Sequence, residues 1–309
     1  MKNTIFKGVG TAIVTPMDES GNIDFVSLGR LLEFQLGHGA DAIIAAGTTG
    51  ESAVLEDWEI IALAEYVIRY VDHRIPVIVG TGSNNTAHSI FLSKEAENLG
   101  ADGLLLVTPY YNKTSQKGLV QHFTAIGDSV DLPMIIYNVP SRTGMDINPE
   151  TYLELSAHPN ICGIKEASGN FARIAETAGL CEGRLDLYSG NDNQTLPVLA
   201  LGGHGVISVL GNLMPEEMHD LCCHYFSGKV GKSRRLQLSL LDLMNALFSD
   251  VNPIPVKSAL SMMGICGDFC RLPLIPFDGE RKEELRKIME KHGLISSFSP
   301  SAVANEASL

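Results

Sequence analysis

Short hydrophobic segments rich in β-branched residues recur along the chain, and a segment with helical periodicity follows each of them. Between the hydrophobic segments, apolar residues recur every three or four positions, with turn or cap residues at the ends. This alternation is typical of βα units around a parallel sheet. The hydrophobic segments span residues 8–16, 41–47, 76–82, 102–109, 133–140, 161–168, 185–191 and 205–210.

Eight βα units within about 225 residues predict a closed (β/α)8 barrel, the TIM barrel, rather than an open doubly wound sheet. After residue 228 the alternation stops, and residues 232–248, 252–264 and 280–293 each have the pattern of a helix. We therefore expect an α/β fold in two parts. A barrel domain covers residues 1–228, and a C-terminal α-helical extension covers residues 229–309, with a frayed tail from about residue 296.

The composition narrows the classes of partner. The chain has 309 residues, of which 36 are acidic and 23 basic, giving a formal net charge of -13. This charge repels nucleic acid and anionic membrane surfaces, so we expect neither as a partner. An anionic ligand would need local donors, such as Arg side chains and backbone N–H groups.

Cysteine usage and the first residues indicate the compartment. The six cysteines have no paired spacing, and a chain of this size does not need disulfides, so we expect reduced thiols. The start, MKNTIFKGVGTAIV, has no signal-peptide pattern, and no apolar run approaches the roughly 20 residues that a bilayer requires. These features predict a cytoplasmic protein without a membrane segment.

Two weak motifs favour neither a metal nor a nucleotide cofactor. The cluster of His219, Cys222, Cys223 and His224 lacks a spacing that would build a tetrahedral site. The sequence GTGSN at residues 80–84 has only part of a dinucleotide fingerprint. We expect no cofactor and no metal.

In a barrel of this kind the active site lies at the C-terminal ends of the strands, where NICGIKEASGN (160–170) places Lys165. A lysine at a strand end usually extends to solvent. Here the neighbours at 162–164 and Ala167 are small or apolar, and alternation sends Glu166 to the opposite face. Desolvation would lower the pKa of Lys165, and a neutral amine attacks carbonyls to form a Schiff base.

Tyrosines at two other strand ends are candidates for the same site. Tyr137 ends the fifth predicted strand, beside the sixth, so its phenol could move protons to and from the Lys165 amine. The alternative is a rim aromatic whose hydroxyl bonds the backbone. Tyr110 and Tyr111 form an exposed aromatic pair, which favours an interface or a lid.

Carboxylate-binding groups are also present. Thr48 and Thr49 lie in the tight turn GTTGE, where N–H groups can bind a carboxylate and hydroxyls can relay protons. Turn chemistry alone would also explain these residues, and both roles can hold together. Arg142, in SRTG, is either a solvated charge or a residue that binds a substrate carboxylate through bidentate hydrogen bonds.

Seven motifs stand in a recognisable order from about Phe6 to Leu294: GTTGES, PYYN, YNVPSRTG, GIKEASG, SGND, GGHGVISV and NPIPVK. The chain thereby resembles the dihydrodipicolinate synthase family of lysine and diaminopimelate biosynthesis. The resemblance implies a Schiff-base-forming lyase that condenses pyruvate with L-aspartate 4-semialdehyde and needs no cofactor.

The resemblance also implies residue roles. Lys165 would form the imine with pyruvate, and Tyr137, Thr49 and Tyr111 would relay protons, with Tyr111 reaching in from the neighbouring subunit of a tight dimer. The implied assembly is a homotetramer, a dimer of dimers. The remaining binding roles fall on Thr48 and Thr49 for the pyruvate carboxylate, Arg142 for the semialdehyde carboxylate, and the backbones of Gly190 and Ile207 near Lys165.

One departure concerns regulation. Family members that lysine inhibits tend to carry an acidic residue and a histidine at an effector site on the dimer interface. In this chain the positions that align with the acidic residue and the histidine are His88, Asp57 and Ile60. The other residues of the effector site match those of the family: Ser52, Ala53, Asn84 and Tyr110. This vestigial effector site predicts weak or absent inhibition by lysine.

Two alternatives stay open. Sugar-acid enzymes such as N-acetylneuraminate lyase and 2-keto-3-deoxy sugar acid aldolase share the Lys and Tyr but generally not the Arg of SRTG. A non-catalytic 2-oxo-acid sensor could keep the pocket, although the intact set of Lys165, Tyr137, Thr49 and Tyr111 argues against lost catalysis.

Overall fold

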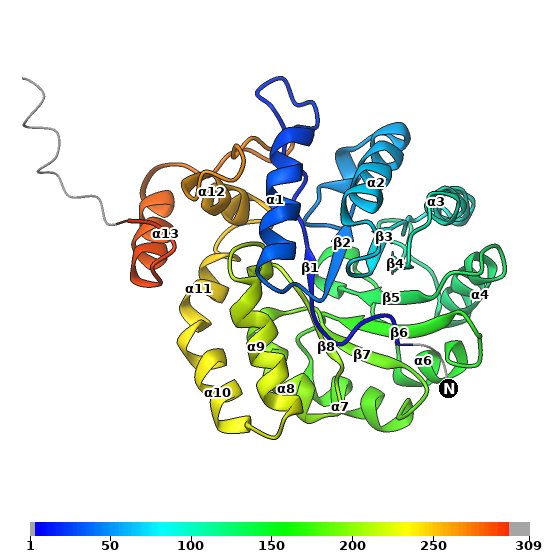
Figure 1. The fold of residues 1–309 in the computed structure, drawn as a ribbon. Helices are drawn as coiled ribbons and strands as arrows, with labels where there is room; N and C mark the ends of the chain where they lie inside the picture. The colour runs from blue at the N-terminus through cyan, green and yellow to red at the C-terminus, as the bar shows by residue number, and fades with distance from the viewer. Residues whose placement is uncertain (1–3, 297–309) are drawn as a thin grey trace, which may run out of the picture.

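The computed structural model describes residues 4–296 and shows a closed barrel of eight parallel strands, paired in sequence order (Figure 1). Each strand lies within one predicted hydrophobic segment, so the predicted (β/α)8 architecture is confirmed. The strands are β1 Gly8–Ala12, β2 Ala42–Ala45, β3 Val77–Gly80, β4 Gly103–Val107, β5 Met134–Asn138, β6 Ile161–Glu166, β7 Asp186–Ser189 and β8 Gly205–Ser208.

Helices follow the strands and surround the barrel (Figure 1). Those of the barrel are α1 Phe25–Gly37, α2 Asp57–Val71, α3 Thr86–Asn98, α4 Gln116–Gly127, α5 Pro140–Thr143, α6 Pro149–Leu155, α7 Phe171–Leu180, α8 Thr195–Ala200 and α9 Pro215–Phe226, with short 3₁₀ turns at Ser52–Val54, Asp192–Gln194 and Leu210–Asn212. The fifth predicted strand ends early: Pro140 opens α5 instead, since its fixed φ and missing N–H suit the first turn of a helix.

The C-terminal helices are α10 Val230–Ser239, α11 Leu241–Ala246, α12 Ile254–Met262 and α13 Gly279–Lys291. The prediction of a single helix over residues 232–248 is therefore wrong, because the helix is interrupted at Leu240 and the segment forms α10 and α11. Asp242, in the first turn of α11, pairs with Lys291 at 2.6 Å and with His292 at 2.8 Å. These contacts hold α11 against α13, and nothing local in the sequence announces them.

The hydrophobic core has two layers. Side chains that point into the barrel form the inner layer, and a larger layer fills the space between strands and helices. Because both faces of a parallel barrel are covered, its strands are apolar almost throughout. Within the inner layer, Phe6 stacks on Tyr188 with ring centroids 4.5 Å apart, and the Tyr188 hydroxyl donates to the Phe6 carbonyl at 2.6 Å.

Helices α10 to α13, coloured yellow to red, run along one side of the barrel in Figure 1. The division at residue 228 into two domains stays a prediction, and the tail predicted to fray lies outside the described residues. Within residues 4–296, none of the helices combines the length and apolar character that crossing a bilayer requires.

Candidate active site

Lys165 lies on the inner face of β6, where its neighbours in the sheet are Tyr137 of β5 and Tyr188 of β7. Its side chain is buried, and Nζ lies 4.2 Å from the centroid of the Tyr137 ring. Burial lowers the pKa of Lys165 to about 7, with a smaller lowering by the Arg142 guanidinium, while the carboxylate of Asp192 opposes the shift. A large fraction of Lys165 is therefore a neutral amine near pH 7.

Asp192 is a buried carboxylate that sequence reasoning did not single out, although it belongs to the SGND motif. It accepts hydrogen bonds from the Ser208 hydroxyl at 2.5 Å and from the N–H groups of Val209 and Leu210 at 3.1 and 2.9 Å. Burial raises the pKa of Asp192, and these bonds and the Lys165 charge lower it. Asp192 is thus a fixed partner that limits the fall of the Lys165 pKa.

Glu166 points away from Lys165, as strand alternation predicts. On the outer face of β6 its carboxylate accepts bonds from Asn138 Nδ2 at 3.1 and 3.2 Å, from the Tyr152 hydroxyl at 3.2 Å and from the Ser168 N–H at 2.7 Å. Every one of these partners lies outside the barrel interior. The network fixes β6 from behind while leaving the Lys165 amine free of a direct carboxylate neighbour on its own strand.

A cavity of about 180 Å³ opens above Lys165 at the C-terminal ends of the strands. Six predicted site residues line it: Thr48, Thr49, Tyr137, Arg142, Lys165 and Gly190. The structure thus brings together, from the turn after β2, from β5, α5 and β6, and from the loop after β7, most of the residues that the sequence singled out. Asn191, Val209, Phe248 and Asn252 also line the cavity and were not predicted.

The two threonines have different partners. Burial raises the pKa of the Tyr137 phenol, and the Arg142 charge and the neighbouring Thr48 side chain partly oppose that rise. The Thr49 hydroxyl instead accepts a bond from Asn252 Nδ2 at 3.0 Å. Thr48 is therefore a further candidate for the proton partner of Tyr137, and the relay role of Thr49, which the sequence resemblance implies, stays a prediction.

Arg142 lies in α5, at the rim of the cavity. Its guanidinium donates to the Asn252 carbonyl at 3.2 Å. Asn252 thereby contacts both Thr49 and Arg142, although it is separated from them by 203 and 110 residues. Only the NPIPVK motif in which Asn252 stands could have drawn attention to it.

Gly190 is needed for a close approach of two strand ends. A Cβ at Gly190 would lie 2.6 Å from the Ala167 Cβ and 3.1 Å from the Glu166 carbonyl oxygen, while the Gly190 N–H donates to that carbonyl at 2.7 Å. Ile207, by contrast, packs within the inner layer of the barrel and does not line the cavity.

Tyr111 does not reach the site of its own chain. Its side chain is 92% exposed, and its backbone has a φ of 67°, in the left-handed region that tyrosine rarely adopts. The loop therefore holds this aromatic ring out from the molecule.

Four of the predicted effector residues, Ser52, Ala53, His88 and Tyr110, line a second cavity of about 340 Å³ that adjoins the first at Thr48 and Arg142. Asn84 donates to the Tyr110 carbonyl at 3.1 Å. The imidazole of His88 already has two partners, Asp57 at 2.7 Å and the Ser83 hydroxyl at 3.2 Å.

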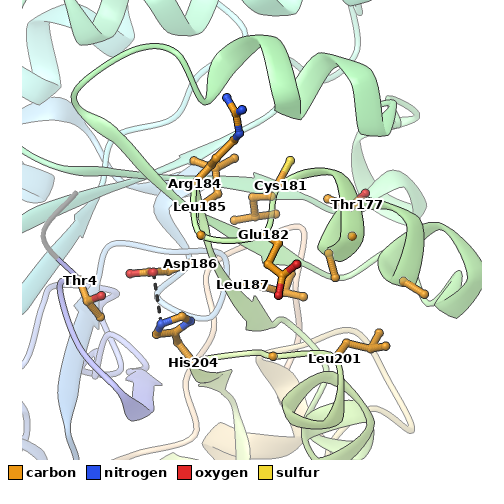
Figure 2. Close-up of a pocket in the computed structure, with 16 residues that line it drawn as sticks. Thr4, Thr177, Cys181, Glu182, Arg184, Leu185, Asp186, Leu187, Leu201 and His204 are labelled. Carbon is orange, nitrogen blue, oxygen red and sulfur yellow. Dashed lines mark ion pairs between the residues drawn. The ribbon is translucent and has the colours of Figure 1, made fainter. Parts of the chain in front are cut away.

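A larger cavity, of about 520 Å³, lies at the opposite end of the barrel (Figure 2). Figure 2 shows Asp186, at the start of β7, facing His204, which precedes β8, with a separation of 3.3 Å. This cavity shares no lining residue with the cavity at Lys165. In the part of the chain that the structure describes, no group of three or more His, Cys, Asp and Glu side chains is arranged to hold a metal ion.

Comparison with known proteins agrees with this geometry. Residues 5–292 match the model of the dihydrodipicolinate synthetase family. The chain is 53% identical over 290 residues to the 4-hydroxy-tetrahydrodipicolinate synthase of Caldicellulosiruptor saccharolyticus, covering 94% of this chain and 98% of that one. Its fold matches the dihydrodipicolinate synthase structure from Thermotoga maritima with a TM-score of 0.93 at 45% identity, covering 94% of this chain and 100% of the other.

A further structural match is the chloride-inhibited dihydrodipicolinate synthase from Acinetobacter baumannii complexed with pyruvate. It has a TM-score of 0.92 at 42% identity, and the match covers 94% of this chain and 100% of that one. Many curated relatives at about 50% identity carry the name 4-hydroxy-tetrahydrodipicolinate synthase. The chain belongs to the dihydrodipicolinate synthetase family of enzymes.

Proposed function

We propose that the protein condenses pyruvate, bound as an imine of Lys165, with L-aspartate 4-semialdehyde to give 4-hydroxy-tetrahydrodipicolinate. The observation that carries the proposal is a buried lysine that lies against the Tyr137 ring and shares one small cavity with Arg142. Burial lowers the pKa of this lysine to about 7. Relatives across nearly the whole chain are named for this reaction.

The first half of the reaction uses Lys165 and Tyr137. The neutral Lys165 amine attacks the C2 carbonyl of pyruvate to form a carbinolamine, which loses water to give the imine. Tyr137 returns a proton to the departing oxygen, and the neighbouring Thr48 side chain gives that proton a path. Loss of a proton from C3 of the imine then produces the enamine. The N–H groups and hydroxyls of the turn containing Thr48 and Thr49 hold the pyruvate carboxylate.

The second half uses Arg142. Its guanidinium holds the carboxylate of the semialdehyde, so that the aldehyde carbon faces the enamine. Carbon–carbon bond formation leaves an imine on Lys165. Attack by the amine of the substrate then closes the ring and displaces the lysine, which regenerates the free amine. We propose that the backbone of Gly190, which lines the cavity, and the backbone of Ile207, in the inner layer of the barrel, complete the site near Lys165.

A coupled assay with defined aldehydes tests the choice of second substrate. We expect turnover with aspartate semialdehyde and none with N-acetylmannosamine or sugar aldehydes; turnover with the sugars alone would refute the proposal.

Arg142→Ala should weaken use of the semialdehyde roughly 10- to 100-fold, since a hydrogen bond to a charged group contributes about 1.5–3 kcal/mol. Imine formation with pyruvate should persist, because it uses other groups.

We also propose that lysine inhibits this enzyme weakly or not at all. The carboxylate of Glu51, which lines the effector cavity, is already paired with Lys257, and the Asp57 carboxylate is held by His88. No unpaired acid among the described lining residues is left for a lysine ammonium. Strong inhibition by lysine below about 1 mM in a dose series would overturn this proposal, because it would require a binding free energy more favourable than about -4 kcal/mol.

For the assembly, we propose a homotetramer built as a dimer of dimers, in which Tyr111 completes the proton relay of the partner's site. The exposure and left-handed backbone of Tyr111 support this role. A cytoplasmic location is proposed on the composition alone, from six cysteines without the spacing of a disulfide framework.

A further inference from the structure

The turn after β2 ends at Glu51, whose carboxylate is buried in a network of charges and backbone groups. Glu51 Oε1 pairs with the ammonium of Lys257, and the two side chains are 1% and 0% exposed. Glu51 Oε2 accepts the Arg271 N–H at 3.1 Å, and Lys257 Nζ also donates to the Phe269 carbonyl at 2.7 Å. Residues more than 200 positions apart are thus joined by a network in which both charges have partners.

Stability alone is a weak explanation for such a pair. Removing two charges from water costs about as much as their attraction returns, and apolar replacements of buried pairs are often neutral or stabilising. What a buried pair does supply is direction and register, because the charges have one geometry in which both are satisfied.

The pair joins the same two segments that meet at the active-site cavity. Glu51 follows Thr49 by two residues, and Lys257 follows Asn252 by five. In the cavity, Asn252 Nδ2 donates to the Thr49 hydroxyl at 3.0 Å, and the Asn252 carbonyl accepts from Arg142. The turn after β2 and the start of α12 are thus connected twice, once at the cavity and once behind it.

The backbone conformation of the turn after β2 is strained, so the turn depends on contacts such as the Glu51–Lys257 pair. Ala46 and Glu51, on either side of the Gly47–Gly50 turn, have φ values of 53° and 57°, in the left-handed region that costs non-glycine residues energy. Contacts outside the turn must hold this conformation. Such contacts include the Thr15 hydroxyl, which donates to the Gly50 carbonyl at 2.7 Å, the Asn252 amide on Thr49, and the Glu51–Lys257 pair.

We propose that Glu51 and Lys257 are positioning residues for the substrate carboxylate. They touch no substrate, and act by fixing the turn of Thr48 and Thr49 against Asn252. This inference rests on the proposed role of those threonines in binding pyruvate. Loss of the pair should displace the carboxylate site and leave the Lys165 amine unchanged, so KM for pyruvate changes far more than kcat.

The test variant is Glu51→Gln combined with Lys257→Met. This double substitution removes both charges without leaving an unpaired one, and Gln still offers an acceptor to the Arg271 N–H. We expect KM for pyruvate to rise about tenfold or more, kcat to stay within about threefold, and borohydride trapping at saturating pyruvate to remain complete. Wild-type KM in the folded double variant would overturn the proposal.

Lys257→Arg keeps the proposal testable should the double variant not fold. It retains the positive charge, but the longer, planar guanidinium cannot hold Glu51 in the same place within a fully buried site. We expect KM to rise about threefold with kcat unchanged, and an unchanged KM in this folded variant counts against positioning.

A matched control is Asp268→Asn, which breaks the half-exposed Asp268–Lys282 pair, 2.7 Å long, in the same C-terminal region. KM should not change, and a rise like that of the double variant would show that any lost pair has this effect. Trapping of pyruvate by the wild-type enzyme separates the two hypotheses: its absence refutes the proposed function, whereas normal trapping with unchanged KM in the variants refutes the positioning role alone.

Discussion

At the scale of single residues, the site depends on an amine that burial keeps largely neutral. Lys165 is surrounded by Tyr137 and the apolar inner layer, and desolvation is the main reason that its pKa falls to about 7. Two charges adjust this value in opposite directions: Asp192 raises it, and Arg142 lowers it. The enzyme therefore has a nucleophile at neutral pH without a dedicated base next to it.

This pKa predicts the pH dependence of pyruvate use. The neutral amine reacts and the ammonium does not, so kcat/KM for pyruvate should be constant well above pH 7 and fall about tenfold per pH unit well below it. Asp192→Asn removes a charge that favours the ammonium, which should move the acid limb to lower pH. Arg142→Ala should move it to higher pH. Stopped-flow or trapping rates between pH 5 and 9 would measure both shifts, and shifts in the same direction would contradict the assignment.

At the scale of elements, the strand ends place the site. Register pairs Tyr137 with Lys165 across β5 and β6, and Gly190 allows β7 to approach the end of β6. The loops that follow are short and tightly bonded, so the cavity is built from backbone that neighbouring strands fix.

Gly190→Ala tests this close approach. The added methyl meets the Ala167 Cβ and the Glu166 carbonyl, neither of which can move away easily, and overpacking of this kind costs about 1–3 kcal/mol. We expect lower stability in urea unfolding and a loss of activity. Gly179→Ala, in α7, is the control, because its Cβ would meet nothing within 4 Å; it should be neutral or slightly stabilising. Equal behaviour of the two variants would argue against a tight approach at Gly190.

Much of the fold and of the candidate site could be predicted from the sequence, because these features depend on local patterns of residues. The strands, their order and the inward direction of Lys165 follow from hydrophobic patterning and the twofold alternation of strands. The role of Asn252, the break at Leu240 and the distinct partners of Thr48 and Thr49 could not be predicted in this way. Each depends on contacts between distant segments or on the rotation of one side chain, which a local pattern does not encode.

At the scale of the whole molecule, the C-terminal region contributes to the site that the barrel forms, because Phe248 and Asn252 line the cavity. Asn252 reaches the cavity from the segment that precedes α12, and Lys257, within α12, pairs with Glu51 of the turn after β2. A second chain is proposed to add Tyr111. A complete site would then need three parts: the barrel, the C-terminal helices and a partner subunit.

Subunit mixing tests the contribution of Tyr111. Tyr111→Phe and Lys165→Ala homodimers should each be nearly inactive. A heterodimer of the two has one complete site, with Lys165 from one chain and Tyr111 from the other. Random mixing should therefore restore about a quarter of wild-type activity, since half of the dimers are mixed and each has one of two sites. No recovery, despite subunit exchange confirmed by native mass spectrometry, would show that Tyr111 does not act across an interface.

The most direct test of the account is reductive trapping of its central intermediate. Incubation with pyruvate and sodium borohydride, followed by peptide mass spectrometry, should place a reduced pyruvyl adduct on Lys165, with activity lost in proportion. Lys165→Ala, folded to the same extent, should gain no adduct. An enzyme that turns over aspartate semialdehyde without any adduct, or with its adduct on another lysine, would contradict the assignment of Lys165 as the Schiff-base residue.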